Sequence, residues 1–193
     1  MGYLYFLLGG ARSGKSSYAE ELAKNLSDKV AYIATAEITD EEMQKRIDLH
    51  KSRRISTWKT FELGNGTPDM EDFKKILNSV MLEKYEVVLL DCITILLFRL
   101  IHNYRLDEME IIDNELEKKI GMEVEAFFKN LIEIIKENDL KFIVVSNEVG
   151  MGVVPPYPLG RIFRDFMGIV NKQMASASDE VYFFVAGLKQ KLK

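Results

Sequence analysis

Short apolar runs alternate with longer segments of helical periodicity along this chain of 193 residues. The apolar runs predict strands at residues 3–8, 30–34, 87–90, 142–145 and 181–185. Nearly all of these runs are continuously apolar, as expected of strands that helices cover on both faces of a sheet. The alternation therefore predicts an α/β fold with a mostly parallel central sheet flanked by helices.

Apolar positions at helical spacing predict the helices between these strands. The first stripe follows a glycine-rich stretch and comprises Tyr18, Ala19, Leu22, Ala23 and Leu26. A capping-box pattern at residues 39–42 predicts a second helix, which carries His50. A long helix is expected over 112–135, with an interruption at Gly121, and a last helix over about 159–177.

The length and the 47% share of hydrophobic residues are enough for one sizeable core, so we expect a single domain over residues 1–193. The net charge of -4 argues against a basic surface for nucleic acid, and a small-molecule partner is favoured. A single cysteine, Cys92, cannot form an internal disulfide, and no Cys/His pairs stand at zinc spacing. Cys92 is interpreted as a small buried hydrophobe.

The N-terminal apolar run is too short to span a bilayer, and the first cation, Arg12, comes after it. It does not fit a signal peptide or a membrane anchor. Together with the cysteine usage, this favours a reducing, cytoplasmic location.

The segment from Gly9 to Ser16, GGARSGKS, fits the pattern G-x-x-x-x-G-K-[ST] without a mismatch. It stands between an apolar strand and an amphipathic helix, which is the context that a P-loop requires. Its backbone N–H groups and the start of the helix suit phosphate oxygens. We expect Lys15 to reach the β and γ phosphates and the Ser16 hydroxyl to bind Mg²⁺, within a P-loop NTPase (RecA-like) fold.

Two other residues carry candidate chemistry. Asp91 ends a buried apolar strand, where a carboxylate supports Mg²⁺ opposite a P-loop; the alternative is that it caps a helix beginning near Thr94. His50 precedes Lys51, Arg53 and Arg54. It either complements a helix dipole or, kept neutral by these cations, serves as a nucleophile.

Two loops and one apolar segment complete the picture. Residues 64–68 are read as a surface turn, whereas residues 147–158 follow an apolar strand at the edge where open parallel sheets bind ligands. The apolar segment 93–101 suits the core or an interface, and core is favoured.

Taken in order, these motifs resemble the bifunctional adenosylcobinamide kinase/adenosylcobinamide-phosphate guanylyltransferase family over nearly the whole chain. The blocks that carry the resemblance are GGARSGKS, Tyr32-Ile33-Ala34-Thr35-Ala36, Arg46-Ile47, His50-Lys51, Arg54, Trp58-Lys59-Thr60, Glu62, Leu90-Asp91-Cys92-Ile93-Thr94, NEVGMGVVP, Leu159, Arg161, Phe163-Arg164-Asp165, Gly168, Asn171 and Asp179-Glu180-Val181. The segment from residue 96 to about 128 matches poorly, and Leu8 and Pro156 depart from the family pattern.

The resemblance implies two reactions. A nucleoside triphosphate phosphorylates adenosylcobinamide, and GTP then transfers GMP to the new phosphate through a GMP-histidine intermediate, releasing pyrophosphate. The position that matches the acceptor is His50, so the resemblance makes His50 and Lys15 the expected catalytic residues. It also suggests a homotrimer, with Mg²⁺ as the cofactor and ATP and GTP as substrates.

The expected site residues fall into two groups. The nucleotide-binding group comprises Gly9, Gly10, Ala11, Arg12, Ser13, Gly14, Lys15, Ser16, Ala34, Thr35, Ala36, Lys51, Ser52, Arg53, Glu62 and Asp91, of which Ser16 and Asp91 are the metal ligands. The possible contacts to adenosylcobinamide or its phosphate are Glu148, Arg161, Arg164 and Asn171. A salt-bridged surface helix is an alternative explanation for Arg161 and Arg164.

Two other functions stay open at this level. One is a monofunctional small-molecule kinase in which His50 is structural. The other is a RecA-like ATPase that acts on DNA, which the acidic pI of about 5.4 argues against.

Overall fold

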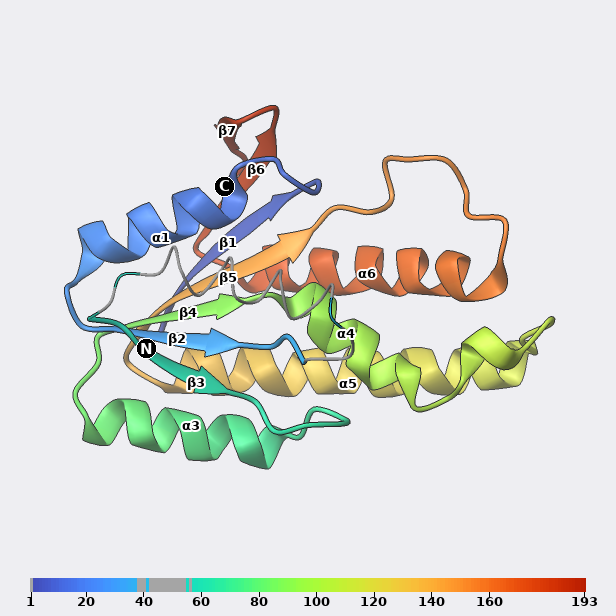
Figure 1. The fold of residues 1–193 in the computed structure, drawn as a ribbon, viewed down its shortest axis with the longest axis horizontal. Coiled ribbons are helices and arrows are strands. Elements are labelled where there is room, and N and C mark those ends of the chain that lie inside the picture. Colours follow the sequence, from blue (N-terminus) through green and yellow to red (C-terminus); the bar gives the residue numbers. More distant parts are fainter. Residues whose placement is uncertain (1, 38–40, 42–54, 56) are drawn as a thin grey trace.

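The computed structural model describes residues 2–37, 41, 55 and 57–193, and within them seven strands form one sheet (Figure 1). The strand order is β3-β2-β4-β5-β1-β6-β7, and every neighbouring pair is parallel except β6 and β7. The bounds are β1 Tyr3–Gly9, β2 Val30–Ala34, β3 Lys59–Glu62, β4 Val87–Asp91, β5 Lys141–Asn147, β6 Glu180–Val185 and β7 Leu188–Lys191. The predicted mostly parallel sheet is confirmed, with β3 and β7 added at its two edges.

Helices cover both faces of this sheet. Figure 1 shows α1 on one face and α3, α5 and α6 on the other. Their bounds are α1 Lys15–Leu26, α3 Met70–Leu82, α4 Ile93–His102, α5 Asn114–Glu137 and α6 Pro158–Ala177, with a short 3-10 helix at Leu106–Glu108. The helices predicted over 112–135 and 159–177 are confirmed with small shifts at their ends.

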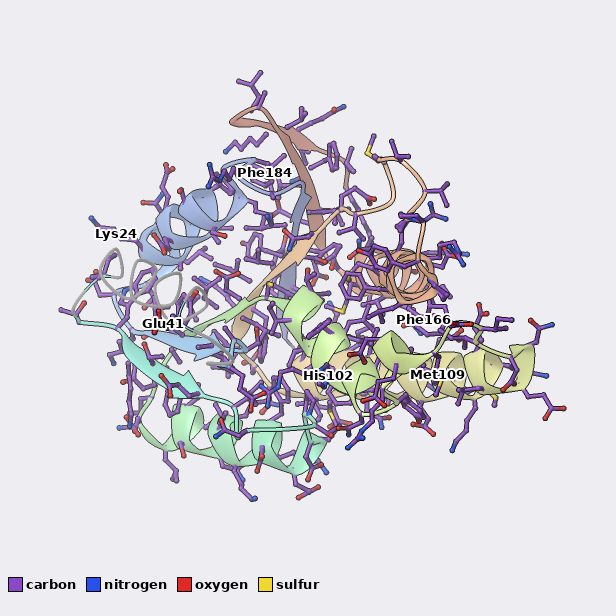
Figure 2. The ribbon with its side chains drawn as sticks, turned by 45° about the vertical axis from the view of Figure 1, so that its right-hand side comes forward. Lys24, Glu41, His102, Met109, Phe166 and Phe184 are labelled. Carbon is purple, nitrogen blue, oxygen red and sulfur yellow. The ribbon has the colours of Figure 1, made fainter. Side chains whose placement is uncertain are left out.

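Alternate residues of each strand point to opposite faces, so the sheet separates two apolar cores. The smaller core joins α1 to the sheet through Ala19, Ala23 and Phe184. The larger core lies under α3, α4, α5 and α6 and includes Phe6 and Phe166. Phe184 and Phe166 mark the two cores in Figure 2. Coverage on both sides explains why the inner strands are continuously apolar.

Helix α5 continues without a break through Gly121, so the predicted interruption is wrong. A Cβ atom on this residue would lie 3.2 Å from Cε1 of Phe166 on α6. The glycine therefore serves close packing between α5 and α6, and the tertiary contact offsets its poor intrinsic helix propensity.

The apolar segment 93–101 belongs to the core, as favoured from the sequence. Ile93, Leu96, Leu97 and Ile101 of α4 are fully buried. The turn at residues 64–68 lies mainly on the surface, as predicted, and leads to Asp69, whose carboxylate caps α3 by accepting a hydrogen bond from the Glu71 N–H at 3.1 Å.

Part of the prediction cannot be compared with the structure. The helix expected after the capping box at 39–42, together with His50, lies outside the described residues. Among the residues that are described, no helix has the length and apolar character needed to cross a membrane.

Candidate functional site

The glycine-rich loop connects the end of β1 to the start of α1. Gly14 adopts a left-handed conformation with φ of 95°, and Arg12 has φ of 57°. The Ser13 N–H donates to the carbonyl of Gly10 at 3.3 Å. These local contacts curl the loop, which places it at the N-terminus of α1, where backbone N–H groups and the helix dipole favour an anion.

Lys15 is the first residue of α1 and is 7% exposed. Its ammonium donates to the carbonyl of Gly10 at 3.0 Å, so the side chain points back over the loop. Burial lowers the pKa of Lys15, while Cys92 and Asp91 act in the opposite direction. A desolvated cation held over a loop of N–H groups suits the charge of a nucleoside triphosphate.

Neighbouring strands brace this loop. The N–H of Glu148, just after β5, donates to the carbonyl of Gly9 at 3.1 Å, and the N–H of Gly187, in the β6–β7 turn, donates to the carbonyl of Ser13 at 3.1 Å. A Cβ atom on Gly9 would lie 2.5 Å from the carbonyl oxygen of Phe184. Gly9 is therefore required by the close approach of β6 as well as by the loop pattern.

Asp91 is the last residue of β4, and Tyr32 donates a hydrogen bond from its hydroxyl to Oδ2 of Asp91 at 2.9 Å. The helix-capping alternative is wrong, because the N-cap of α4 is Cys92 and not Asp91. The Asp91 carboxylate and the Ser16 hydroxyl are hard oxygen donors of the kind that Mg²⁺ prefers alongside phosphate oxygens and water. The donor chemistry thus fits the expected metal.

No group of three or more His, Cys, Asp or Glu side chains gathers as a metal site in the part of the chain that the structure describes. Cys92 packs partly buried against the core on the α1 side. Desolvation, followed by the charge of Asp91, raises the pKa of its thiol to about 11, so the thiol is protonated at neutral pH. A protonated thiol is a poor nucleophile, which agrees with the structural interpretation of Cys92.

The sheet register brings several expected nucleotide residues to one level. Ala34 of β2 pairs with Glu62 of β3 on one side and with Asp91 of β4 on the other. Thr35 follows directly and is fully buried. Its hydroxyl donates to the Cys92 carbonyl at 2.9 Å and accepts from the Cys92 N–H at 2.8 Å. Thr35 is thus a structural tie between the ends of β2 and β4.

The loop after β5 carries other expected residues. Glu148 accepts a hydrogen bond from the N–H of Gly150 at 2.5 Å. Arg161 of α6 donates from Nη1 to the carbonyls of Pro155 and Pro156, at 3.1 and 2.8 Å, and so holds the far end of the loop. Between these anchors the loop exposes apolar side chains: Met151, Val153, Val154 and Tyr157.

The remaining two candidates differ in their surroundings. Arg164 pairs with its neighbour Asp165 at 3.1 Å, so the salt-bridge alternative describes Arg164, whereas Arg161 forms no ion pair within the described part of the chain. Asn171 is buried: its Oδ1 accepts from the Ser146 hydroxyl at 2.6 Å, and its Nδ2 donates to the Asn147 carbonyl at 3.1 Å. Asn171 therefore fixes the end of β5 against α6.

Arg99 is a residue of this edge that the motifs did not indicate. It is buried on α4, and its guanidinium contacts the segments that follow β2 and β3. The available signal was its position, since it is the only charged residue in the apolar segment 93–101. A lone cation in such a segment needs buried partners.

The expected residues His50, Lys51, Ser52 and Arg53 lie outside the described residues. The structure therefore brings together the P-loop, Asp91, Ala34 to Ala36, Glu62 and the loop at Glu148 along the carboxyl edge of the sheet, which is where open parallel sheets bind ligands.

Comparisons with known proteins agree with this arrangement. An ATPase from the type III secretion system of pathogenic bacteria is similar in fold, with a TM-score of 0.58 and 9% identity over 99% of this chain and 58% of that chain. At that identity the likeness concerns the fold alone, and it agrees with the predicted P-loop NTPase fold class.

Two curated proteins are much more similar to this chain in sequence than that ATPase is. The chain is 38% identical over 192 residues to the bifunctional adenosylcobalamin biosynthesis protein CobU of Escherichia coli, covering 98% of this chain and 99% of that protein. It is 36% identical over 192 residues to the protein of the same name from Salmonella typhimurium, with the same shares covered. The CobU family model, described as cobinamide kinase / cobinamide phosphate guanyltransferase, matches residues 5–192. The chain belongs to this family.

Proposed function

We propose that this protein phosphorylates adenosylcobinamide with a nucleoside triphosphate and then transfers GMP from GTP to the product, giving adenosylcobinamide-GDP and pyrophosphate. The observation that carries the proposal is the P-loop with its buried Lys15, at the same sheet edge as Asp91, in a chain that belongs to the CobU family over nearly its whole length. The acidic net charge favours such substrates over nucleic acid.

In the kinase step, the oxygen of the substrate hydroxyl attacks the γ-phosphorus, a new O–P bond forms, and the bond between the γ-phosphorus and the bridging β-phosphate oxygen breaks. The hydroxyl proton is released to water. The nucleoside diphosphate leaves. The chain contributes positioning and charge, because the P-loop N–H groups and Lys15 stabilise the phosphate oxygens. Ser16 and Asp91 would hold Mg²⁺, which would supply further positive charge beside the phosphates. ATP and GTP both supply the required γ-phosphate.

In the guanylyl transfer step, a neutral nitrogen of His50 attacks the α-phosphorus of GTP. A P–N bond forms, the bond between the α-phosphorus and the oxygen that bridges the α and β phosphates breaks, and pyrophosphate leaves. An oxygen of adenosylcobinamide phosphate then displaces the histidine. The covalent intermediate divides one difficult transfer into two easier ones. Lys51, Ser52 and Arg53 are proposed to bind the triphosphate, together with Ala34 to Ala36 and Glu62.

The loop after β5 is proposed to contact the cobinamide. Glu148 lies next to the P-loop, because its backbone N–H donates a hydrogen bond to the carbonyl of Gly9. Arg161 and Arg164 lie on α6, which follows the loop after β5. Asn171 acts by holding the end of β5 rather than through the substrate, because its amide is engaged within the fold.

The proposal also includes the setting of the enzyme. We infer one catalytic domain, a homotrimer and a cytoplasmic location. The family resemblance supports the trimer, and the length and cysteine content of the chain support the other two inferences.

The experiment is a reaction of the purified protein with adenosylcobinamide, Mg²⁺ and either ATP or GTP, with the corrinoid products identified by mass spectrometry. Formation of adenosylcobinamide phosphate with ATP, and of adenosylcobinamide-GDP only when GTP is added, supports both activities. A phosphate product that never acquires GMP contradicts the bifunctional proposal and favours the monofunctional kinase. No corrinoid product with either nucleotide contradicts both.

A further inference from the structure

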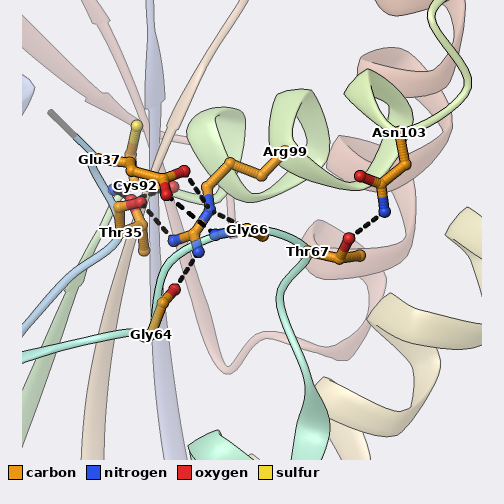
Figure 3. Close-up of polar contacts among 8 residues, drawn as sticks. All are labelled: Thr35, Glu37, Gly64, Gly66, Thr67, Cys92, Arg99 and Asn103. Atoms are coloured by element: carbon orange, nitrogen blue, oxygen red, sulfur yellow. Dashed lines mark hydrogen bonds and ion pairs between the residues drawn. The ribbon is translucent and has the colours of Figure 1, made fainter. Parts of the chain in front are cut away.

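Arg99 makes a concentrated set of contacts for one side chain (Figure 3). Nε donates to the carbonyl of Gly66 at 2.9 Å, Nη1 donates to the carbonyl of Thr35 at 3.1 Å, and Nη2 donates to the carbonyl of Gly64. Nε also lies 3.6 Å from a carboxylate oxygen of Glu37. The guanidinium thus connects α4 to the segments that leave β2 and β3.

The same carboxylate closes the network. Oε1 of Glu37 accepts a hydrogen bond from the N–H of Gly66 at 2.9 Å, so the two segments are joined directly as well as through Arg99. Asn103, the residue that caps the C-terminus of α4, donates to the hydroxyl of Thr67. The turn at residues 64–67 is therefore fastened to α4 at two points.

The guanidinium at the centre of these contacts is buried, whereas Gly64, Gly66 and Thr67 around it lie at the surface. Arg99 is 6% exposed, and a charged group taken out of water is stable only when its donors are matched by acceptors. The rigid fork of a guanidinium serves several acceptors in fixed directions, whereas a lysine ammonium is a single point. The arrangement therefore depends on arginine and not merely on positive charge.

The contacts lead to the nucleotide edge through Thr35. Its carbonyl accepts from Arg99, and its hydroxyl exchanges two hydrogen bonds with the backbone of Cys92, next to Asp91. The backbone N–H of Thr35 also donates to the carbonyl of Asp91 at 3.3 Å. Loss of the guanidinium fork would loosen the residues after β2 and, through them, the end of β4.

We propose that Arg99 is a positioning residue for nucleotide binding, which holds residues 35–37 and 64–66 so that the carboxyl edge of β2, β3 and β4 is formed before GTP arrives. This inference rests on the proposed function, since it takes that edge as part of the nucleotide site. A preformed edge lowers the cost of ordering the protein upon binding.

The test compares Arg99→Lys with Arg105→Lys, a matched control at an exposed arginine whose guanidinium lies 3.7 Å from the carboxylate of Glu108, three residues further along the chain. Amide hydrogen exchange is measured first, because it reports local opening without any activity. We expect about tenfold faster exchange at residues 35–37 and 64–66 in Arg99→Lys, with α5 unchanged and the control identical to wild type. Unchanged exchange at these segments overturns the inference.

Equilibrium binding of methylanthraniloyl-GTP is the second measurement. We expect Arg99→Lys to raise Kd about tenfold, as loss of a preformed edge requires, with no change in the control. Glu37→Gln, which keeps its size but loses the charge opposite Arg99, is expected to raise Kd about threefold and serves if Arg99→Lys fails to fold. Faster exchange with an unchanged Kd overturns the nucleotide role.

These measurements separate this inference from the proposed function. Wild-type protein that binds the GTP analogue but modifies no cobinamide contradicts the proposed function, while the same shift in Kd for Arg99→Lys still supports a positioning role. Wild-type protein that does not bind the analogue contradicts both.

Discussion

At the scale of single residues, polar groups that are buried and paired stabilise the carboxyl edge of the sheet, where the P-loop and Asp91 lie. Thr35 has no solvent exposure, yet its hydroxyl serves as both donor and acceptor for the Cys92 backbone. Lys15 shows the opposite case, since its burial disfavours its charge. Thr35 therefore stabilises the fold. The buried charge of Lys15 lowers the stability of the unliganded protein, and its proposed role in phosphate binding explains why it is kept.

Thr35→Val keeps the shape of the side chain and removes its hydroxyl. The N–H and carbonyl of Cys92 lose these partners, so we expect the free energy of unfolding to fall by about 2 kcal/mol. Urea denaturation measures it. Thr35→Ser, which retains the hydroxyl, is the control and should lose less. A Thr35→Val protein as stable as wild type contradicts this account of the tie between β2 and β4.

Lys15→Met removes the buried charge, and we expect the kinase rate to fall at least about 100-fold. The unliganded protein should become more stable by about 1 kcal/mol at pH 7. Burial lowers the pKa of Lys15, so the unfolded chain binds more protons at this site than the native one. The buried ammonium therefore lowers the stability of the folded protein fully at pH values below the lowered pKa. This loss of stability disappears as the pH rises toward 10.5, the ordinary pKa of lysine.

Thermal unfolding of wild type and Lys15→Met across pH 7–10.5 measures how the difference in stability between them changes with pH. The extra stability of the variant should shrink toward high pH. An advantage that grows with pH, or a variant less stable than wild type at pH 7, contradicts a desolvated Lys15.

At the scale of elements, the C-terminal hairpin supports the P-loop. β6 and β7 are joined by Ala186 and Gly187, both with positive φ, at 51° and 80°. Two such residues indicate a type I′ turn, which places the Gly187 N–H against the carbonyl of Ser13. The strand β7 therefore matters to the site although all its residues are exposed.

Ala186→Asn tests this turn, because asparagine followed by glycine is the preferred pair of a type I′ turn, whereas alanine at positive φ is strained. We expect thermal unfolding to show a gain of about 0.5–1 kcal/mol. Gly187→Val places a β-branched residue at φ of 80° and should cost about 1–2 kcal/mol. The turn assignment is contradicted if the two substitutions shift stability in the same direction.

The elements also show what the sequence could predict. Strand β2 was predicted with its observed bounds, because its five residues are apolar and all are buried. Strands β3 and β7 were missed, since KTFE and LKQK lie at the two edges of the sheet and carry half or more polar residues. Apolar periodicity detects strands covered on both faces and not edge strands.

The candidate site likewise includes residues that the sequence could predict and residues that it could not. The P-loop and Asp91 were visible as motifs, because phosphate binding requires particular residues at fixed spacing. The role of Arg99 depends on three backbone carbonyls from segments more than 30 residues away, which no local pattern encodes. The break expected at Gly121 failed for a similar reason, since contact with Phe166 overrides local propensity.

At the scale of the whole molecule, the sheet order places the P-loop and the Thr35 segment on one edge. The P-loop follows β1 and the Thr35 segment follows β2, with β4 and β5 between them. At about 4.8 Å per strand, these segments start about 14 Å apart. This spacing separates the P-loop from the second nucleotide contact that we propose on the same edge.

The proposed trimer is a prediction at this scale. Sedimentation equilibrium should give a mass about three times that of the 22.2 kDa chain at micromolar concentration. A mass equal to one chain, in preparations with full activity, contradicts the trimer without affecting the chemistry.

The most direct test of the bifunctional account is covalent labelling by GTP that carries a radioactive α-phosphate, in the presence of Mg²⁺, followed by denaturing electrophoresis. The account predicts label on wild type that acid removes and alkali does not, as expected of a phosphoramidate, and no label on His50→Ala. Wild-type protein that never labels while still phosphorylating adenosylcobinamide, or His50→Ala protein that labels as wild type does, contradicts it.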